Sequence, residues 1–394
     1  MPTLSNCQIE SRKTSAAKPG CPTGEKRRWW QFRAWHGMTT PAWFRLLWEN
    51  RLAVTPGRWY ILLLISVTSL FNSVFAILQT AIFGRRVART RLGKDPIIIL
   101  GHWRSGTTLL HELMSLDPQH HFPSTYACLA PEHFLVSQRL VSRWLSFLMP
   151  NRRSQDNVQL DLDGPQEDEW AICAMGLPSP YRAVAFPNRL PHAAQYVTLR
   201  HVTAREARRW KRKWHSFLKA VSLQAPGKRL VLKSPLHTAR LPILMELFPN
   251  ARFVHIVRNP RAVFPSTMRL WRRLAEDDGL QIPPPAAFES FVLENYTRLF
   301  EAYERGAHLI PPHRLCEVRY EDLVREPVGT VKRIYQRLEL GDPNKLPAAL
   351  YDFAAKTADF QTNTYRHTPE DDARVEQHWG SIGARLGYGT KDAA

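Results

Sequence analysis

Five consecutive residues that follow a short apolar run have side chains suited to binding an anion. They combine a cation, three hydroxyl groups and a glycine: Arg104, Ser105, Gly106, Thr107 and Thr108. The apolar run before them, between Pro96 and Gly101, is β-branched and unbroken, as in a strand buried on both faces. Leucines recur at helical spacing after the loop, which predicts a helix there. The first backbone N–H groups of that helix should point to the same place as the arginine and hydroxyl side chains. The segment therefore predicts a binding site for a phosphate or sulfate group.

Further apolar runs predict the strands that must hold this loop in place. They cover residues 229–232, 252–257 and 315–320, and a helical pattern follows each of them, whereas residues 120–124 indicate a turn. Successive strand–helix units favour a parallel sheet with right-handed crossovers. We therefore expect an α/β fold, P-loop-like and three-layered, with a central parallel sheet flanked by helices and an N-terminal helical appendage.

The loop has the spacing of a P-loop without its lysine. Two glycines stand five residues apart, at Gly101 and Gly106, and two threonines follow where a P-loop has Lys and Ser or Thr. The lysine that would contact the β- and γ-phosphates is absent, which argues against a nucleotide kinase or triphosphatase.

The strand-to-helix motif Arg-Ser-Gly-Thr-Thr resembles the 5′-phosphosulfate-binding loop of sulfotransferases that use 3′-phosphoadenosine 5′-phosphosulfate (PAPS). Arg258, with Ser266 eight residues later, is similar to the pair that binds the 3′-phosphate in that family, and residues 319–323 match a third family element. The resemblance implies transfer of a sulfuryl group from PAPS to a hydroxyl or amine, with Arg104 in the catalytic loop. It also implies that Lys233 contacts the bridging oxygen, where an ammonium stabilises the departing phosphate. No metal is required, because a sulfuryl group carries one negative charge that protein cations can balance.

The general base is the point at which this chain departs from the better-known branches of the family. Pro235 stands where cytosolic members have a histidine, and Ser124 and Thr125 stand where tyrosylprotein enzymes have a glutamate. Similar bacterial sequences share the Pro-Gln-Glu-Asp-Glu element, so Glu167 is the base that we prefer. The alternatives are Glu169, His237 and His102.

Composition favours an anionic partner without identifying it. The chain has 54 Lys and Arg against 35 Asp and Glu, a formal net charge of +19. No nucleic-acid-binding motif accompanies this charge, so we expect no nucleic acid partner. The acceptor stays open among glycan, lipid, peptide and small alcohol. The rival hypotheses are a P-loop-type nucleotide kinase, and a non-catalytic nucleotide-fold protein associated with membranes or nucleic acid.

The chain divides into three regions by composition. Residues 1–28 predict a disordered basic tail, residues 29–95 a helical segment rich in aromatic, basic and apolar residues, and residues 96–394 the catalytic domain. Residues 60–83 carry no charge, yet their Ser, Thr, Asn and Gln side chains share one helical face. A membrane span, monotopic attachment and packing on the catalytic domain therefore all remain open. The scattered cysteines favour a reducing compartment, so we expect a cytoplasmic protein with peripheral membrane contact through residues 29–90.

Overall fold

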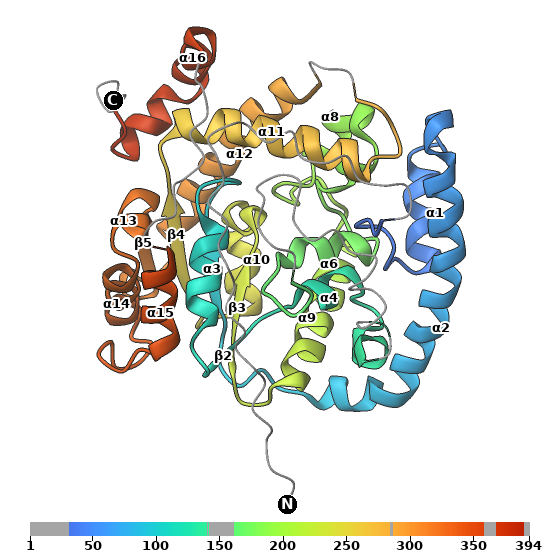
Figure 1. The fold of residues 1–394 in the computed structure, drawn as a ribbon, viewed down its shortest axis with the longest axis horizontal. Coiled ribbons are helices and arrows are strands. Elements are labelled where there is room, and N and C mark those ends of the chain that lie inside the picture. The colour runs from blue at the N-terminus through green and yellow to red at the C-terminus, as the bar shows by residue number, and fades with distance from the viewer. Residues whose placement is uncertain (1–30, 140, 142–160, 284–286, 358–367, 390–394) are drawn as a thin grey trace, which may run out of the picture.

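A parallel sheet of five strands forms the centre of the protein, in the order β2-β3-β1-β4-β5 (Figure 1). The computed structural model describes residues 31–139, 141, 161–283, 287–357 and 368–389. The strands are β1 (Ile97–Leu100), β2 (His120–His121), β3 (Arg229–Lys233), β4 (Arg252–Val257) and β5 (Leu315–Arg319). The α/β fold with a central parallel sheet is confirmed. Where we expected only a turn, β2 pairs with the edge of β3. The predicted tail at residues 1–28 lies outside the described residues.

Helices cover both faces of the sheet because β1 buries its side chains alternately on the two sides. Ile97 and Ile99 pack with α3 (Thr107–Ser115) and α14 (Pro327–Leu338). Ile98 and Leu100 pack with the aromatic face of α9 (Ala204–Gln224). A strand that is apolar at every position is thus buried on both sides, as parallel sheets require.

The remaining helices surround this three-layered body. They are α1 (Thr40–Glu49), α2 (Trp59–Arg89), α4 (Thr125–Leu129), α6 (Asp168–Ala174), α7 (Arg182–Ala185), α8 (Leu190–Ala194), α10 (Leu241–Leu247), α11 (Pro260–Asp278), α12 (Ala287–Ala307), α13 (Tyr320–Arg325), α15 (Ala348–Thr357) and α16 (Pro369–Arg385). Short 3-10 turns lie at Pro56–Arg58, Pro187–Arg189, Pro235–Ala239 and Pro312–Arg314.

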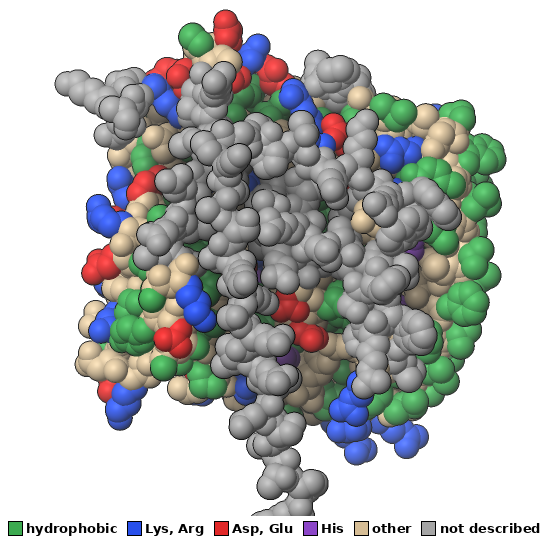
Figure 2. All heavy atoms as spheres, in the orientation of Figure 1, with side chains coloured by type: hydrophobic (Ala, Val, Ile, Leu, Met, Phe, Trp, Pro, Cys, Tyr) green, Lys and Arg blue, Asp and Glu red, His purple; other side chains and the backbone are tan. Residues whose placement is uncertain are grey.

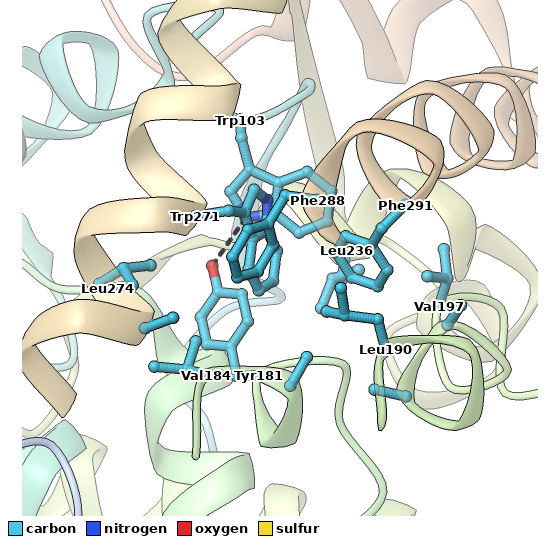
Figure 3. Packing of buried hydrophobic residues seen from close by; sticks show 14 of the residues in the cluster. Trp103, Tyr181, Val184, Leu190, Val197, Leu236, Trp271, Leu274, Phe288 and Phe291 are labelled. Atoms are coloured by element: carbon cyan, nitrogen blue, oxygen red, sulfur yellow. Dashed lines mark hydrogen bonds between the residues drawn. The ribbon is translucent and has the colours of Figure 1, made fainter. Parts of the chain in front are cut away.

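A second apolar core joins the N-terminal helices to the rest of the protein. Trp35 and Trp43 are buried in the same cluster as Trp271 of α11 and Phe291 of α12. Figure 3 shows part of this cluster, in which the rings of Trp271 and Phe291 meet edge to face with centroids 4.8 Å apart. The packing of residues 31–95 is therefore continuous with the packing of α11 and α12.

Candidate active site

The candidate site lies at the carboxyl end of β1, where the chain changes direction across the sheet. β3 lies on one side of β1 and β4 on the other, and ligands of open parallel sheets bind at such a switch point. The loop from Gly101 to Gly106 leads from β1 into α3, whose first backbone N–H groups, at Thr107 and Thr108, have no acceptor within the helix. A helix start of this kind favours an anion.

The loop is held by its own contacts and by close neighbours. Gly106 has φ +100°, and a Cβ atom there would lie 2.3 Å from Cδ2 of Tyr320, so only glycine fits. The hydroxyl of Ser105 donates to the carbonyl of His102 at 2.8 Å, and the hydroxyl of Thr238 accepts from Gly101 N at 2.7 Å. The Ser105 hydroxyl thus stabilises the loop itself and does not point outward as a donor.

The two predicted phosphate-binding elements contact each other. Arg104, at φ +65°, donates from Nε to the Ser266 hydroxyl at 2.8 Å. Arg258 donates to the Arg104 carbonyl at 3.1 Å, and its guanidinium lies 4.1 Å from the ring centroid of Tyr320. The structure therefore brings Arg104, Arg258 and Ser266 together, with the aromatic ring supporting the Arg258 guanidinium.

Lys233 and Glu167 form an ion pair beside the first turn of α3. The register places Lys233 beside Ile99 of β1, at the carboxyl end of β3. Its Nζ lies 2.7 Å from Oε1 of Glu167 and 3.4 Å from the Thr108 hydroxyl, and the lysine side chain is 2% exposed. The ammonium thus lies between the first turn of α3 and a carboxylate.

Tyr181 holds the other carboxylate oxygen of Glu167. Its hydroxyl donates to Oε2, and it accepts a hydrogen bond from Trp103 Nε1 at 3.0 Å, drawn as a dashed line in Figure 3. Burial, and then the negative charge of Glu167, raise the pKa of Tyr181 well above its ordinary value. The phenol therefore stays protonated and orients the carboxylate. No motif in the sequence marks Tyr181, because it stands in an apolar stretch far from the loop.

Two of the alternative bases are held by buried polar partners. Glu169 accepts two hydrogen bonds from Arg240, at 2.7 and 3.2 Å, and both side chains are inaccessible to solvent. His237 lies 3.0 Å from Asp168, which also accepts from Trp214 Nε1. These groups pack α6 against the 3-10 turn after β3. These contacts hold the first turn of α6 in place, and Glu167 stands directly before that turn.

His102 is the remaining alternative base, and it is buried in an aromatic environment. Its Nδ1 lies 2.8 Å from the Trp103 carbonyl, and its ring packs against Tyr296 at 4.8 Å between centroids. Burial lowers its pKa to about 3. The imidazole is therefore neutral in the folded protein and is 1% exposed, which gives it no route to a bound acceptor.

Comparison with known proteins identifies the family of this arrangement. The model of the sulfotransferase family matches residues 96–344. The omega-hydroxy-beta-dihydromenaquinone-9 sulfotransferase Stf3 of Mycobacterium bovis is 43% identical over 363 residues, which are 92% of this chain and 93% of the relative. Human carbohydrate sulfotransferase 6 is 26% identical over 271 residues, which are 61% of this chain and 62% of that protein.

Solved structures show the same fold at low sequence identity. Sulfotransferase STF9 from Mycobacterium avium aligns with a TM-score of 0.63 at 16% identity, over 84% of this chain and 86% of that one. Sulfotransferase STF1 from Mycobacterium tuberculosis aligns with a TM-score of 0.54 at 18% identity, over 86% and 91% of the two chains.

Proposed function

The chain belongs to the sulfotransferase family, and we propose that it transfers a sulfuryl group from PAPS to a hydroxyl group on an apolar lipid. The proposal for the acceptor rests on the relative that is 43% identical, whose name specifies a hydroxylated menaquinone derivative. The observation that carries the proposed chemistry is the place of Lys233, between Thr108 of the loop helix and Glu167.

The charges available at the loop suit a phosphosulfate. The start of α3 offers backbone N–H groups, and Arg104 offers a cation beside them. Arg258 and Ser266 both contact Arg104, whereas Lys233 contacts Thr108, and we assign the first pair to a second anion such as a 3′-phosphate. Among the described residues no three His, Cys, Asp or Glu side chains cluster as metal ligands do. We assign the charge balance to the arginines and the lysine.

The proposed reaction is an in-line displacement at sulfur. The acceptor oxygen forms a bond to sulfur while the bond from sulfur to the bridging oxygen of the phosphosulfate breaks. Negative charge then grows on that oxygen, and the Lys233 ammonium stabilises it or gives it a proton. The proton of the acceptor hydroxyl passes to the Glu167 carboxylate.

Glu167 is the base that the surroundings favour. Its side chain is 15% exposed, while Glu169 and His237 are inaccessible in their pairs. Lys233 and Tyr181 each occupy one of its oxygens, yet every carboxylate oxygen can accept a second hydrogen bond. A substrate hydroxyl that reaches Glu167 would therefore meet an oriented carboxylate. Lys233, the cation proposed to stabilise the leaving phosphate, lies next to that carboxylate.

Calorimetry with two nucleotides tests the donor. We expect adenosine 3′,5′-bisphosphate to bind at least tenfold more tightly than ADP, because only the former carries the 3′-phosphate that Arg258 would contact. Equal affinities, or ATP binding that requires magnesium, would refute PAPS as the donor and favour a nucleotide kinase.

Transfer of labelled sulfate tests the acceptor. Purified protein would be incubated with labelled PAPS and either a polyprenyl quinone bearing a terminal hydroxyl or the same quinone without it. We expect label only on the hydroxylated lipid. Label on glycans or peptides of a cell extract, and none on the lipid, would overturn the lipid acceptor while leaving the sulfotransferase activity intact.

The cytosol supplies PAPS, so we also infer that the active site faces the cytoplasm.

A further inference from the structure

Helix α2 turns toward the protein a face that carries serines and amides beside the buried Ile61 and Ile65, and it turns an apolar face toward solvent. Its serines and amides bind the segments beneath it: Ser66 accepts from Trp43 Nε1 at 3.0 Å, Ser73 accepts from Thr40 N at 2.9 Å, and Gln79 accepts from Leu135 N at 2.7 Å. In an ordinary surface helix the apolar stripe faces the core and the polar face meets water. α2 reverses this pattern.

The outward face of α2 is a continuous apolar stripe along the edge of the molecule. Its members follow helical spacing, and all are exposed: Leu63, Val67, Leu70, Phe71, Val74, Ile77, Leu78 and Ile82. Ile77 is 70% exposed. Figure 2 shows hydrophobic side chains along this margin, where Figure 1 places α1 and α2. An exposed apolar area of this length marks a contact with a membrane or another protein.

Aromatic residues extend the stripe at its N-terminal end. Trp48 at the end of α1 is 80% exposed, and Phe44, Trp59 and Tyr60 are exposed near it. Tryptophan and tyrosine favour the boundary between lipid tails and headgroups, because an apolar ring carries a polar group there.

Arginines flank the stripe at both ends, and Glu49, the acid next to Trp48, is paired with Arg182. Residues 59–89 contain no Asp or Glu, and Arg85, Arg86 and Arg89 are exposed in the last turns. Arg51 is exposed before the first turn, and Arg58, partly exposed, starts it. Figure 2 shows Lys and Arg side chains at the lower end of the apolar margin. A helix that lies parallel to a membrane surface brings both of its ends to the depth of the lipid headgroups. Cations at both ends of one apolar face therefore suit anionic headgroups.

We infer that α2, with the exposed end of α1, docks this protein in the plane of an anionic membrane surface, with the apolar stripe among the lipid tails. By length and composition, Pro56–Arg89 is the one helix among the described residues that could cross a bilayer. A crossing would separate Ser66, Ser73 and Gln79 from their partners in the protein and leave them in hydrocarbon. Docking in the plane keeps every one of these hydrogen bonds. This inference does not depend on the proposed acceptor or donor.

Sedimentation with vesicles tests the docking. The full chain would be mixed with vesicles of phosphatidylcholine and phosphatidylglycerol in equal parts, or of phosphatidylcholine alone. We expect binding to the mixed vesicles that falls at least tenfold in L70D/I77D, because two charges would enter the hydrocarbon. We expect R85Q/R86Q to lose most of the preference for the anionic vesicles.

Matched controls separate docking from loss of fold. Leu309 is also an exposed apolar residue, away from the α1–α2 face, so L309D should bind vesicles as the parent does. Arg325 is an exposed arginine of α13, and R325Q should keep the anionic preference. Absence of vesicle binding by the parent, or a stable dimer in solution that L70D/I77D dissociates, would overturn the membrane as the occupant of this face.

Nitroxide labels distinguish docking in the plane from crossing. With Cys7 and Cys21 replaced by serine, single labels would be attached at L63C, L70C and I77C, and their depths measured with vesicles. Residues 63 and 77 lie about 21 Å apart along a helix axis. In-plane docking predicts similar shallow depths for the three labels. A depth difference between L63C and I77C that approaches that length would show a crossing and overturn the inference.

Discussion

The ammonium of Lys233 lies 2.7 Å from the Glu167 carboxylate, although the two residues are 66 positions apart in the sequence. Lys233 ends β3 and Glu167 precedes α6, so the pair forms only when α6 packs beside the sheet. This contact places the proposed leaving-group cation and the proposed base side by side. Stabilisation of the leaving group and removal of the substrate proton are therefore both assigned to the same part of the site.

Loss of the lysine should affect turnover more than donor binding. We expect Lys233→Ala to lower kcat by about a hundredfold or more, since charge on the departing oxygen would lack its cation. Affinity for adenosine 3′,5′-bisphosphate, measured by calorimetry, should change much less. Lys213→Ala is the matched control, because Lys213 pairs with Glu132 at the same 2.7 Å but on a partly exposed surface. An unchanged kcat in Lys233→Ala would reject the role of this lysine.

Substitution of the Glu167 carboxylate should lower kcat more than substitution of its partner, the Tyr181 phenol. We expect Glu167→Gln to lower kcat by about 100- to 10,000-fold, because an amide cannot take the proton from the substrate hydroxyl. Tyr181→Phe removes the hydrogen bond that orients Glu167 and the one that Trp103 Nε1 donates to the phenol, and we expect a loss of about tenfold. Initial rates with labelled PAPS measure both. If Glu132→Gln impaired the enzyme as severely as Glu167→Gln, the assignment of the base would be wrong.

Arg258 should determine the preference for a 3′-phosphate. We expect Arg258→Ala to weaken adenosine 3′,5′-bisphosphate about 10- to 100-fold while affinity for adenosine 5′-phosphate stays close to that of the parent. Arg258→Lys should restore little, because a lysine cannot stack on Tyr320 as the guanidinium does. Calorimetric titrations provide both constants, with Arg325→Ala as an exposed control. Equal losses for the two nucleotides would place the 3′-phosphate elsewhere.

Gly106 should tolerate no side chain. We expect Gly106→Ala to destabilise the fold by more than the roughly 1 kcal/mol that positive φ costs alanine, because its Cβ would also collide with Tyr320. Gly227→Ala isolates the conformational cost, since Gly227 has φ +83° and no heavy atom within 4 Å of a built Cβ. Urea unfolding compares the two variants. Equal losses of stability would show that the contact with Tyr320 is unimportant.

Two buried imidazoles should make the fold less stable in mild acid. Burial lowers the pKa of both His102 and His111 from 6.5 to about 3, and the charge of Lys233 contributes at His111. The unfolded chain therefore takes up these protons as the pH falls below 6.5 while the folded chain does not. Each imidazole should remove about 1.4 kcal/mol of stability per pH unit there.

Unfolding by urea at neutral and mildly acidic pH checks this dependence. His111→Gln keeps a donor for the Val231 carbonyl and should show a smaller loss between the two pH values. His308→Gln, at an exposed histidine, should leave the loss unchanged. A parent protein equally stable at both pH values would contradict the expectation.

The sequence by itself determined the sheet and the loop that follows its first strand. The run before Gly101 is apolar at every position, and such a run has no stable place except inside a parallel sheet. The loop and its helix are local in the chain, so spacing alone predicts that Arg104 and Thr108 lie near a helix start. The strands ending at Lys233 and Val257 were predictable for the same reason.

Only the tertiary structure decided which distant groups meet and which way α2 faces. The sequence favours Glu167 as the base, with Glu169, His237 and His102 as alternatives. Packing places Glu167 beside Lys233, while Arg240 holds Glu169 and Asp168 holds His237. Tyr181 has no local pattern at all. The periodicity of α2 revealed two unlike faces, but periodicity does not say which face meets the protein. Hydrogen bonds from α1 and the segment after α4 settle that question, because buried polar groups must find partners.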